Sequence, residues 1–156
     1  MRPVTKLIIG VPLFWYPISM VHEIGHYAFA RIGGATGVEI VWRNYVFSET
    51  IRTGSRWPIL DVWMGPVIGI IIPLVIAYTL RKTKLAEWVA WFAAIACIAN
   101  GLYIGIGWMD VGGDSSDMIT QGCPLAFLIG FGLSSFSIGL FLLMKNHANE
   151  ALKPSP

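Results

Sequence analysis

Charged side chains are scarce in this chain of 156 residues. Lys, Arg, Asp and Glu make up 13% of it, whereas 55% is hydrophobic. Soluble domains carry about 25% charged residues, so the composition indicates a membrane protein. The net charge of +2 is spread over short segments and forms no basic face, which argues against a nucleic-acid partner.

Cysteine is also rare, with only Cys97 and Cys123 in the chain. Neither belongs to a paired spacing such as C-x-x-C, which would indicate a metal or redox site. A free cysteine usually behaves as a small buried apolar residue. We therefore interpret both as structural thiols.

Internal repeats, low-complexity tracts and linkers are absent, apart from a polar, proline-ended tail over 145–156. A helix that spans a bilayer needs about 20 mostly apolar residues. Four stretches meet this requirement, and they cover about 7–30, 59–80, 85–108 and 124–144. The sequence thus predicts an all-α integral membrane protein with about four transmembrane helices in a single core, 1–144.

The segment between the first two apolar stretches is too polar to span a membrane. Within it, 38–42 and 45–47 are rich in β-forming residues and are separated by Arg43-Asn44, after a glycine-rich start at 33–37. This pattern predicts a short β-hairpin inserted after the first helix.

Residues His22 to His26 spell H-E-I-G-H within the first apolar stretch. On a helix, positions four apart share one face, so both imidazoles can bind one zinc ion while Glu23 reaches a bound water. Zinc lowers the pKa of such a water toward about 7, and a carboxylate can then accept its proton. The motif predicts a hydrolytic zinc site with Glu23 as general base.

A structural interpretation is that these side chains only satisfy one another inside a helix bundle, or that five letters matched by chance. Ionisable groups at the centre of a membrane cost about 2.5 kcal/mol or more each and are usually functional there. This cost favours the metal interpretation.

A catalytic zinc ion usually has three protein ligands, so one more must come from elsewhere. With four spans, the side of the membrane where the first helix ends also carries the first loop, the start of the second span and the loop after the third. The acidic residues on that side are Asp61, Asp110, Asp114 and Asp117, with Glu39 and Glu49 on the hairpin.

Asp114 is the favoured third ligand. Gly112-Gly113 lets the chain turn closely before it, and Ser115-Ser116 indicates a new helix after it. The structural alternative is that Asp114 caps that helix. Asp110 and Asp117 remain alternative ligands.

Two further features lie at a membrane depth similar to that of His22. Asn100, in the third apolar stretch, is a candidate to stabilise the oxyanion of a tetrahedral intermediate, or alternatively forms an interhelical hydrogen bond. Gly65-Pro66 and Gly69 begin the second stretch, and small residues at this spacing let helices approach closely. We interpret them as packing residues that help to shape a substrate cleft.

In their order along the chain, His22-Glu23-Ile24-Gly25-His26, then Met64-Gly65-Pro66-Val67-Ile68-Gly69, then Asn100 followed by an aspartate in a glycine-rich loop resemble the site-2 protease family of intramembrane zinc metalloproteases. The resemblance covers most of the chain. It implies Zn²⁺ bound by His22, His26 and Asp114, catalysis by Glu23 with Asn100 nearby, and cleavage of a transmembrane protein or peptide within the lipid bilayer.

The orientation in the membrane stays open. Seven of the eleven Lys and Arg residues lie at the N-terminus, at 81–84 and in the tail, and four lie in the first loop. This count predicts cytoplasmic termini and a site that faces outward. The resemblance implies a site open to the cytosol. We expect a multi-pass protein of a bacterial-type cell membrane, and the sequence does not indicate its oligomeric state.

Two other functions compete with proteolysis. One is a catalytically silent, zinc-binding scaffold or helix-binding protein, which would have no need of a base such as Glu23. The other is a zinc or proton transporter, because intramembrane His and Asp also mark ion paths. A single cluster near one side of the membrane does not outline a through-path.

Overall fold

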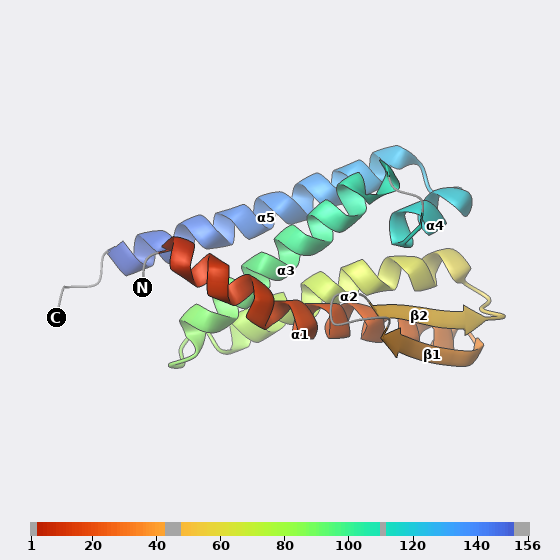
Figure 1. The fold of residues 1–156 in the computed structure, drawn as a ribbon, viewed down its shortest axis with the longest axis horizontal. Coiled ribbons are helices and arrows are strands. Elements are labelled where there is room, and N and C mark those ends of the chain that lie inside the picture. Colours follow the sequence, from red (N-terminus) through yellow and green to blue (C-terminus); the bar gives the residue numbers. More distant parts are fainter. Residues whose placement is uncertain (1–2, 43–47, 110–111, 152–156) are drawn as a thin grey trace.

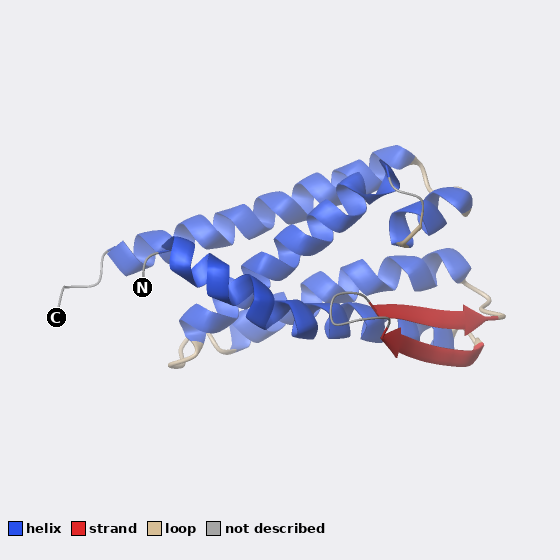
Figure 2. Cartoon of the chain, in the orientation of Figure 1, coloured by secondary structure: helices blue, strands red, loops and turns tan. Residues whose placement is uncertain are grey.

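A computed structural model describes residues 3–42, 48–109 and 112–151 of the chain. Five α-helices and one two-stranded sheet make up this part (Figures 1 and 2). In chain order they are α1 (Pro3–Ile32), β1 (Thr36–Trp42), β2 (Ser48–Thr53), α2 (Pro58–Thr79), α3 (Ala86–Ile106), the 3₁₀ turn η1 (Gly107–Met109), α4 (Asp114–Thr120) and α5 (Leu125–Ala151).

The long helices form two packed pairs, α1 with α2 and α3 with α5, and contacts between α2 and α3 join the pairs. Among the described residues, three helices are long and apolar enough to cross a membrane, namely Pro58–Thr79, Ala86–Met109 and Leu125–Ala148. The mainly helical fold is therefore as expected. The predicted fourth span over 7–30 is not confirmed by this criterion, although α1 is a continuous helix of 30 residues.

The outer faces of these helices are apolar. Tyr78 at the end of α2 is 68% exposed, and Leu133 and Met144 on α5 are 65% and 71% exposed. Large exposed apolar faces are unusual in soluble monomers and mark surfaces that another apolar phase covers. These faces are suited to contact with lipid.

Helix α1 remains one helix although Pro12 and Pro17 lie inside it. A proline removes one intrahelical hydrogen bond and crowds the preceding turn, which bends a helix and need not end it when neighbouring helices support it. Figure 1 shows α1 changing direction along its length before its C-terminal half runs beside α2. That half carries His22 and His26.

The predicted hairpin is present after α1, with antiparallel pairs from Thr36↔Thr53 to Trp42↔Ser48. Its second strand was expected at 45–47, but the described strand β2 covers Ser48–Thr53 and is mostly polar. Residues 43–47 lie outside the described residues. The hairpin packs along the C-terminal half of α1.

One apolar cluster positions the short helix α4. Val62 of α2, Ile104 of α3, Met118 of α4 and Leu128 of α5 are each fully buried against one another. Because these four side chains come from four helices, the cluster fixes α4 over the end of the bundle. Asp114, the first residue of α4, is thereby directed toward α1.

Candidate metal centre

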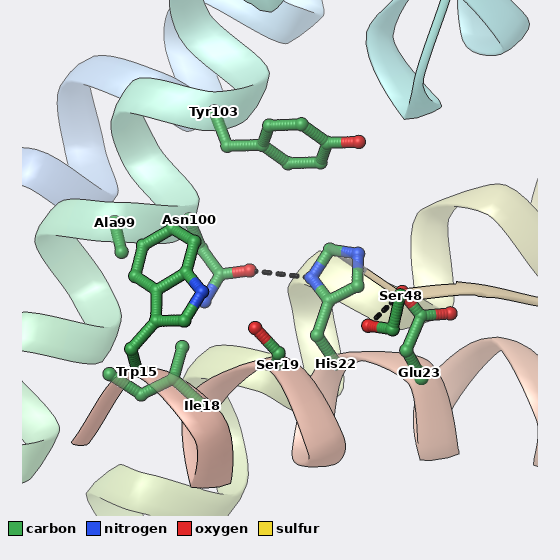
Figure 3. Close-up of a pocket in the computed structure, with 9 residues that line it drawn as sticks. All are labelled: Trp15, Ile18, Ser19, His22, Glu23, Ser48, Ala99, Asn100 and Tyr103. Carbon is green, nitrogen blue, oxygen red and sulfur yellow. Dashed lines mark hydrogen bonds between the residues drawn. The ribbon is translucent and has the colours of Figure 1, made fainter. Parts of the chain in front are cut away.

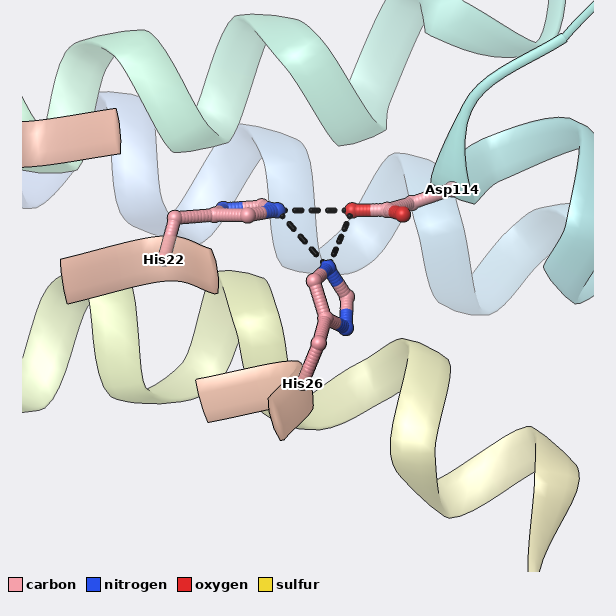
Figure 4. Close-up of side chains that lie close together, drawn as sticks. All are labelled: His22, His26 and Asp114. Carbon is pink, nitrogen blue, oxygen red and sulfur yellow. Dashed lines mark hydrogen bonds and ion pairs between the residues drawn. The ribbon is translucent and has the colours of Figure 1, made fainter. Parts of the chain in front are cut away.

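Three side chains from two distant parts of the chain meet at one point (Figure 4). The Nε2 atom of His22 lies 2.8 Å from Oδ2 of Asp114 and 3.0 Å from Nε2 of His26, and the latter lies 3.1 Å from the same Oδ2. All three residues are buried or partly buried, and together they form a group that can hold a metal ion.

The outward ring nitrogen of each histidine has an oxygen partner. His22 Nδ1 lies 2.8 Å from Oδ1 of Asn100, whose amide nitrogen donates to the carbonyl of Ala96. His26 Nδ1 lies 2.7 Å from the backbone carbonyl of Asp61. Since both oxygens can only accept, each Nδ1 carries the proton and each neutral ring presents the lone pair of Nε2 to the shared point.

Two imidazole lone pairs and one carboxylate oxygen thus face one another at hydrogen-bond distance. Without a cation between them, these three electron-rich atoms would repel. Metal-binding histidines typically donate their other N–H to a carbonyl or an amide or carboxylate oxygen, as both rings do here. The donor set therefore fits a metal cation.

Asp114 is held in place by its neighbours. Gly113, with φ 80°, precedes α4 at the N-cap position without a side-chain cap. Ser115 Oγ donates to the carbonyls of Tyr103 and Ile104, and the Asp114 amide donates to the Tyr103 hydroxyl.

Of the other candidate acids, those within the described part of the chain do not join this group. Asp110 lies outside the described residues, and Asp117 is exposed on α4. Asp61 is fully buried and contributes its backbone carbonyl to His26, not its carboxylate to the group. Glu39 and Glu49 are exposed on the hairpin.

The carboxylate of Glu23 is held by the hairpin. Thr50 Oγ1 donates to Oε2 at 2.6 Å. Ser48 Oγ, drawn beside Glu23 in Figure 3, donates to Oε1 at 3.1 Å. Ser48 and Thr50 are two residues apart on β2, so their side chains share one face of the strand. Sequence reasoning missed both residues, although the alternation of Ser48, Thr50 and Arg52 was a readable signal.

Gly65 and Gly69 lie against the site, on successive turns of α2. A Cβ atom at Gly65 would overlap the imidazole of His26, and one at Gly69 would meet the Asn100 amide at about 3 Å. On the facing helix, a Cβ at Gly25 would overlap the backbone of Met64. Gly25 therefore lets α1 and α2 approach closely, and Gly65 leaves space on α2 for the metal-binding ring of His26.

Asn100 lies close to the site, 3% exposed, and forms the interhelical hydrogen bond to His22. Its Nδ2 group has two hydrogens, and one is donated to Ala96. The second hydrogen is available for another acceptor. The oxyanion role of Asn100 stays a prediction.

A cavity of about 120 Å³ opens beside His22 and Glu23. Figure 3 shows its lining side chains, which come from α1, β2 and α3. Besides the polar residues already described, Trp15, Ile18, Ser19 and Ala99 line it. A substrate group placed in this cavity would lie next to both the metal-binding histidine and the motif glutamate.

Comparisons with models of known families, with curated proteins and with solved structures found no match to this chain.

Proposed function

We propose that this protein is an intramembrane zinc metalloprotease of the site-2 protease kind. One observation carries the proposal: His22, His26 and Asp114 direct three ligand atoms at one point, and Glu23 shares a cavity with the first of them. Three protein ligands with one position left open is the arrangement of catalytic zinc sites. A purely structural zinc site would have four protein ligands.

The geometry favours zinc over a larger ion. Ligands of a tetrahedral zinc ion at about 2.0–2.1 Å lie roughly 3.3 Å from one another. The three separations in the group, 2.8, 3.0 and 3.1 Å, are close to this value. Calcium prefers six to eight oxygen ligands, whereas two of the three donors here are imidazole nitrogens.

A bound zinc ion supplies Lewis acidity, which acidifies water and polarises a peptide carbonyl. Glu23 accepts the proton of the attacking water and delivers it to the leaving amine, so the C–N bond breaks and the water oxygen ends in the new carboxylate. The hydroxyls of Ser48 and Thr50 hold the Glu23 carboxylate in one orientation for both transfers. Asn100 orients His22 and offers its second amide hydrogen to the developing oxyanion.

The proposed substrate is a transmembrane protein or peptide. The apolar outer faces and the three candidate spans support action inside a lipid bilayer, with α1 as a fourth span over about 7–30 in a bacterial-type cell membrane. A buried His, Glu, His and Asp set would be too costly within apolar helices without a functional reason. A peptide bond must be unwound before water can attack it, so the cut would fall where a substrate helix frays.

The test is cleavage of labelled single-span peptides by purified protein in bilayer discs, with wild type beside Glu23→Gln. The variant should keep one zinc ion per chain and lose at least about 100-fold in rate, the usual scale for a general base. Glu49→Gln, an exposed acid on the hairpin, is the matched control and should cleave as wild type does. Equal cleavage by Glu23→Gln would refute the mechanism.

A second candidate function is a zinc-stabilised scaffold that binds membrane helices without cutting them. The contacts of Glu23 with Ser48 and Thr50 favour it, because they also tie the hairpin to α1. In a scaffold, Glu23→Gln would lower the melting temperature and detach the hairpin from the helical core, so that an added protease would cut the hairpin. In a protease, the main loss would be in rate.

A further inference from the structure

The cavity beside the metal centre extends away from the polar end of the site. Trp15, Ile18 and His22 are spaced by three and four residues on α1, so they lie along one face of the helix. Trp15 is seven residues, or roughly 10 Å, from His22 toward the N-terminus of α1. The cavity thus leads from the metal-binding ring into the apolar part of the bundle.

The far walls of the cavity are apolar. They comprise the indole of Trp15 and the aliphatic chain of Ile18 from α1, and the methyl group of Ala99 from α3 (Figure 3). Most of the polar lining residues, namely Glu23, Ser48, Asn100 and Tyr103, lie around His22, and Ser19 lines the cavity between Ile18 and His22. A group that enters therefore meets polar partners at the metal centre and apolar partners beyond it.

The volume limits what the apolar end can take. A dry apolar cavity of about 150 Å³ binds benzene, and this cavity, partly open and with its polar part included, measures about 120 Å³. This volume suits a branched aliphatic side chain better than an indole. Ala99 is part of the apolar wall, and a larger residue there would fill part of this space.

We propose that this cavity is a specificity pocket that takes a branched aliphatic side chain, of the size of Val or Leu, next to the scissile bond. The inference rests on the proposed proteolytic function, and it names the substrate class as an apolar segment cut beside such a residue. A side chain that fills the pocket fixes the neighbouring carbonyl relative to His22 and Glu23. Charged and very large side chains at that position are rejected.

Binding is measured first, because it does not require turnover. Zinc-loaded protein is titrated with three peptide hydroxamates that share a backbone and carry a methyl, an isobutyl or an indolylmethyl side chain. We expect the isobutyl compound to bind on the order of 50-fold more tightly than the methyl compound, since three more carbons are buried. The indolylmethyl compound should bind more weakly than the isobutyl compound.

Two variants test the pocket itself. Ala99→Leu fills it and should reverse the order, so that the methyl compound binds best, while Trp15→Ala enlarges it and should admit the indole. Ala90→Leu adds the same three carbons to α3 beside a different hollow and should leave the order unchanged. Zinc content of one ion per chain shows that each variant is folded.

The outcomes separate this proposal from the proposed function. An unchanged order in zinc-loaded Ala99→Leu, or equal binding of all three compounds to wild type, overturns the pocket even if peptides are cleaved. If the three hydroxamates bind in the expected order of affinity but no peptide is cleaved, the pocket is supported and the proposed proteolytic function is refuted. When peptides are cleaved, mapped cut sites of wild type should lie beside Val or Leu, and those of Ala99→Leu beside Ala or Gly.

Discussion

Thr50 donates a 2.6 Å hydrogen bond to Oε2 of Glu23, so a strand of the hairpin holds the carboxylate of the zinc motif. Ser48, on the same face of β2, binds the other carboxylate oxygen at 3.1 Å. The hairpin is therefore part of the site and not only an insertion between two helices.

Thr50→Val should impair catalysis without loss of zinc. A hydrogen bond to a charged group is worth about 1.5–3 kcal/mol, so the cleavage rate should fall about tenfold or more. Thr50→Ser keeps the hydroxyl and should retain most activity. Thr53→Val, in the same strand but bonded to the Thr36 carbonyl, is the control. A full rate in Thr50→Val would mean that the hairpin does not position Glu23.

Gly65→Ala should abolish zinc binding. The new methyl group would overlap the His26 ring, which must then leave its position against Asp114. Gly130→Ala makes the same change within α5, where a Cβ would meet no described atom within 4 Å, and it should be neutral or slightly stabilising. Zinc retained at one ion per chain in Gly65→Ala would contradict this packing.

Asn100→Ala should weaken zinc binding and slow cleavage. Loss of the oxygen that accepts from His22 Nδ1 typically costs about 10–100-fold in metal affinity. At saturating zinc, the rate should remain about 100-fold low, because the proposed oxyanion donor is missing. A rate fully restored by zinc would leave Asn100 with the orienting role alone. Equilibrium dialysis and zinc-dependent kinetics separate the two effects.

Arg52→Met should destabilise the fold. Asp61 is fully buried, its carboxylate oxygens have no hydrogen-bond partner in the described part of the chain, and Arg52 Nε lies 3.9 Å away. Removal of the cation leaves a buried charge alone, at a typical cost of about 3–5 kcal/mol. The double variant with Asp61→Leu should recover most of the melting temperature. Arg56→Met, at an exposed site, should change it little; an equal loss in both single variants would disprove the pairing.

How much of the site could be predicted from the sequence depends on how far apart in the chain the interacting residues are. His22 and His26 are four residues apart on one helix, so local periodicity places them together. Asp114 was favoured by the topology and by the turn at Gly112-Gly113, and the structure brings it to both histidines. These are the parts for which local spacing or chain order suffices.

Other parts depend on contacts that no local pattern encodes. The partner of His26 is the backbone carbonyl of Asp61. Every residue has such a carbonyl, so the residue type does not indicate this contact. Strand β2 was missed because Ser48 and Thr50 are polar and lie on the face that binds Glu23, whereas strand prediction relies on apolar alternation. The overlap that a side chain at Gly65 would cause becomes visible only when α1 and α2 are packed.

The central claim is that His22, His26 and Asp114 hold one zinc ion. Zinc per chain, measured on purified wild type beside Asp114→Ala and Asp117→Ala, tests it most directly. We predict one ion per chain in wild type and in Asp117→Ala, and a loss of zinc in Asp114→Ala. Full zinc in Asp114→Ala, or no zinc in the wild-type protein, would contradict the proposed metal centre.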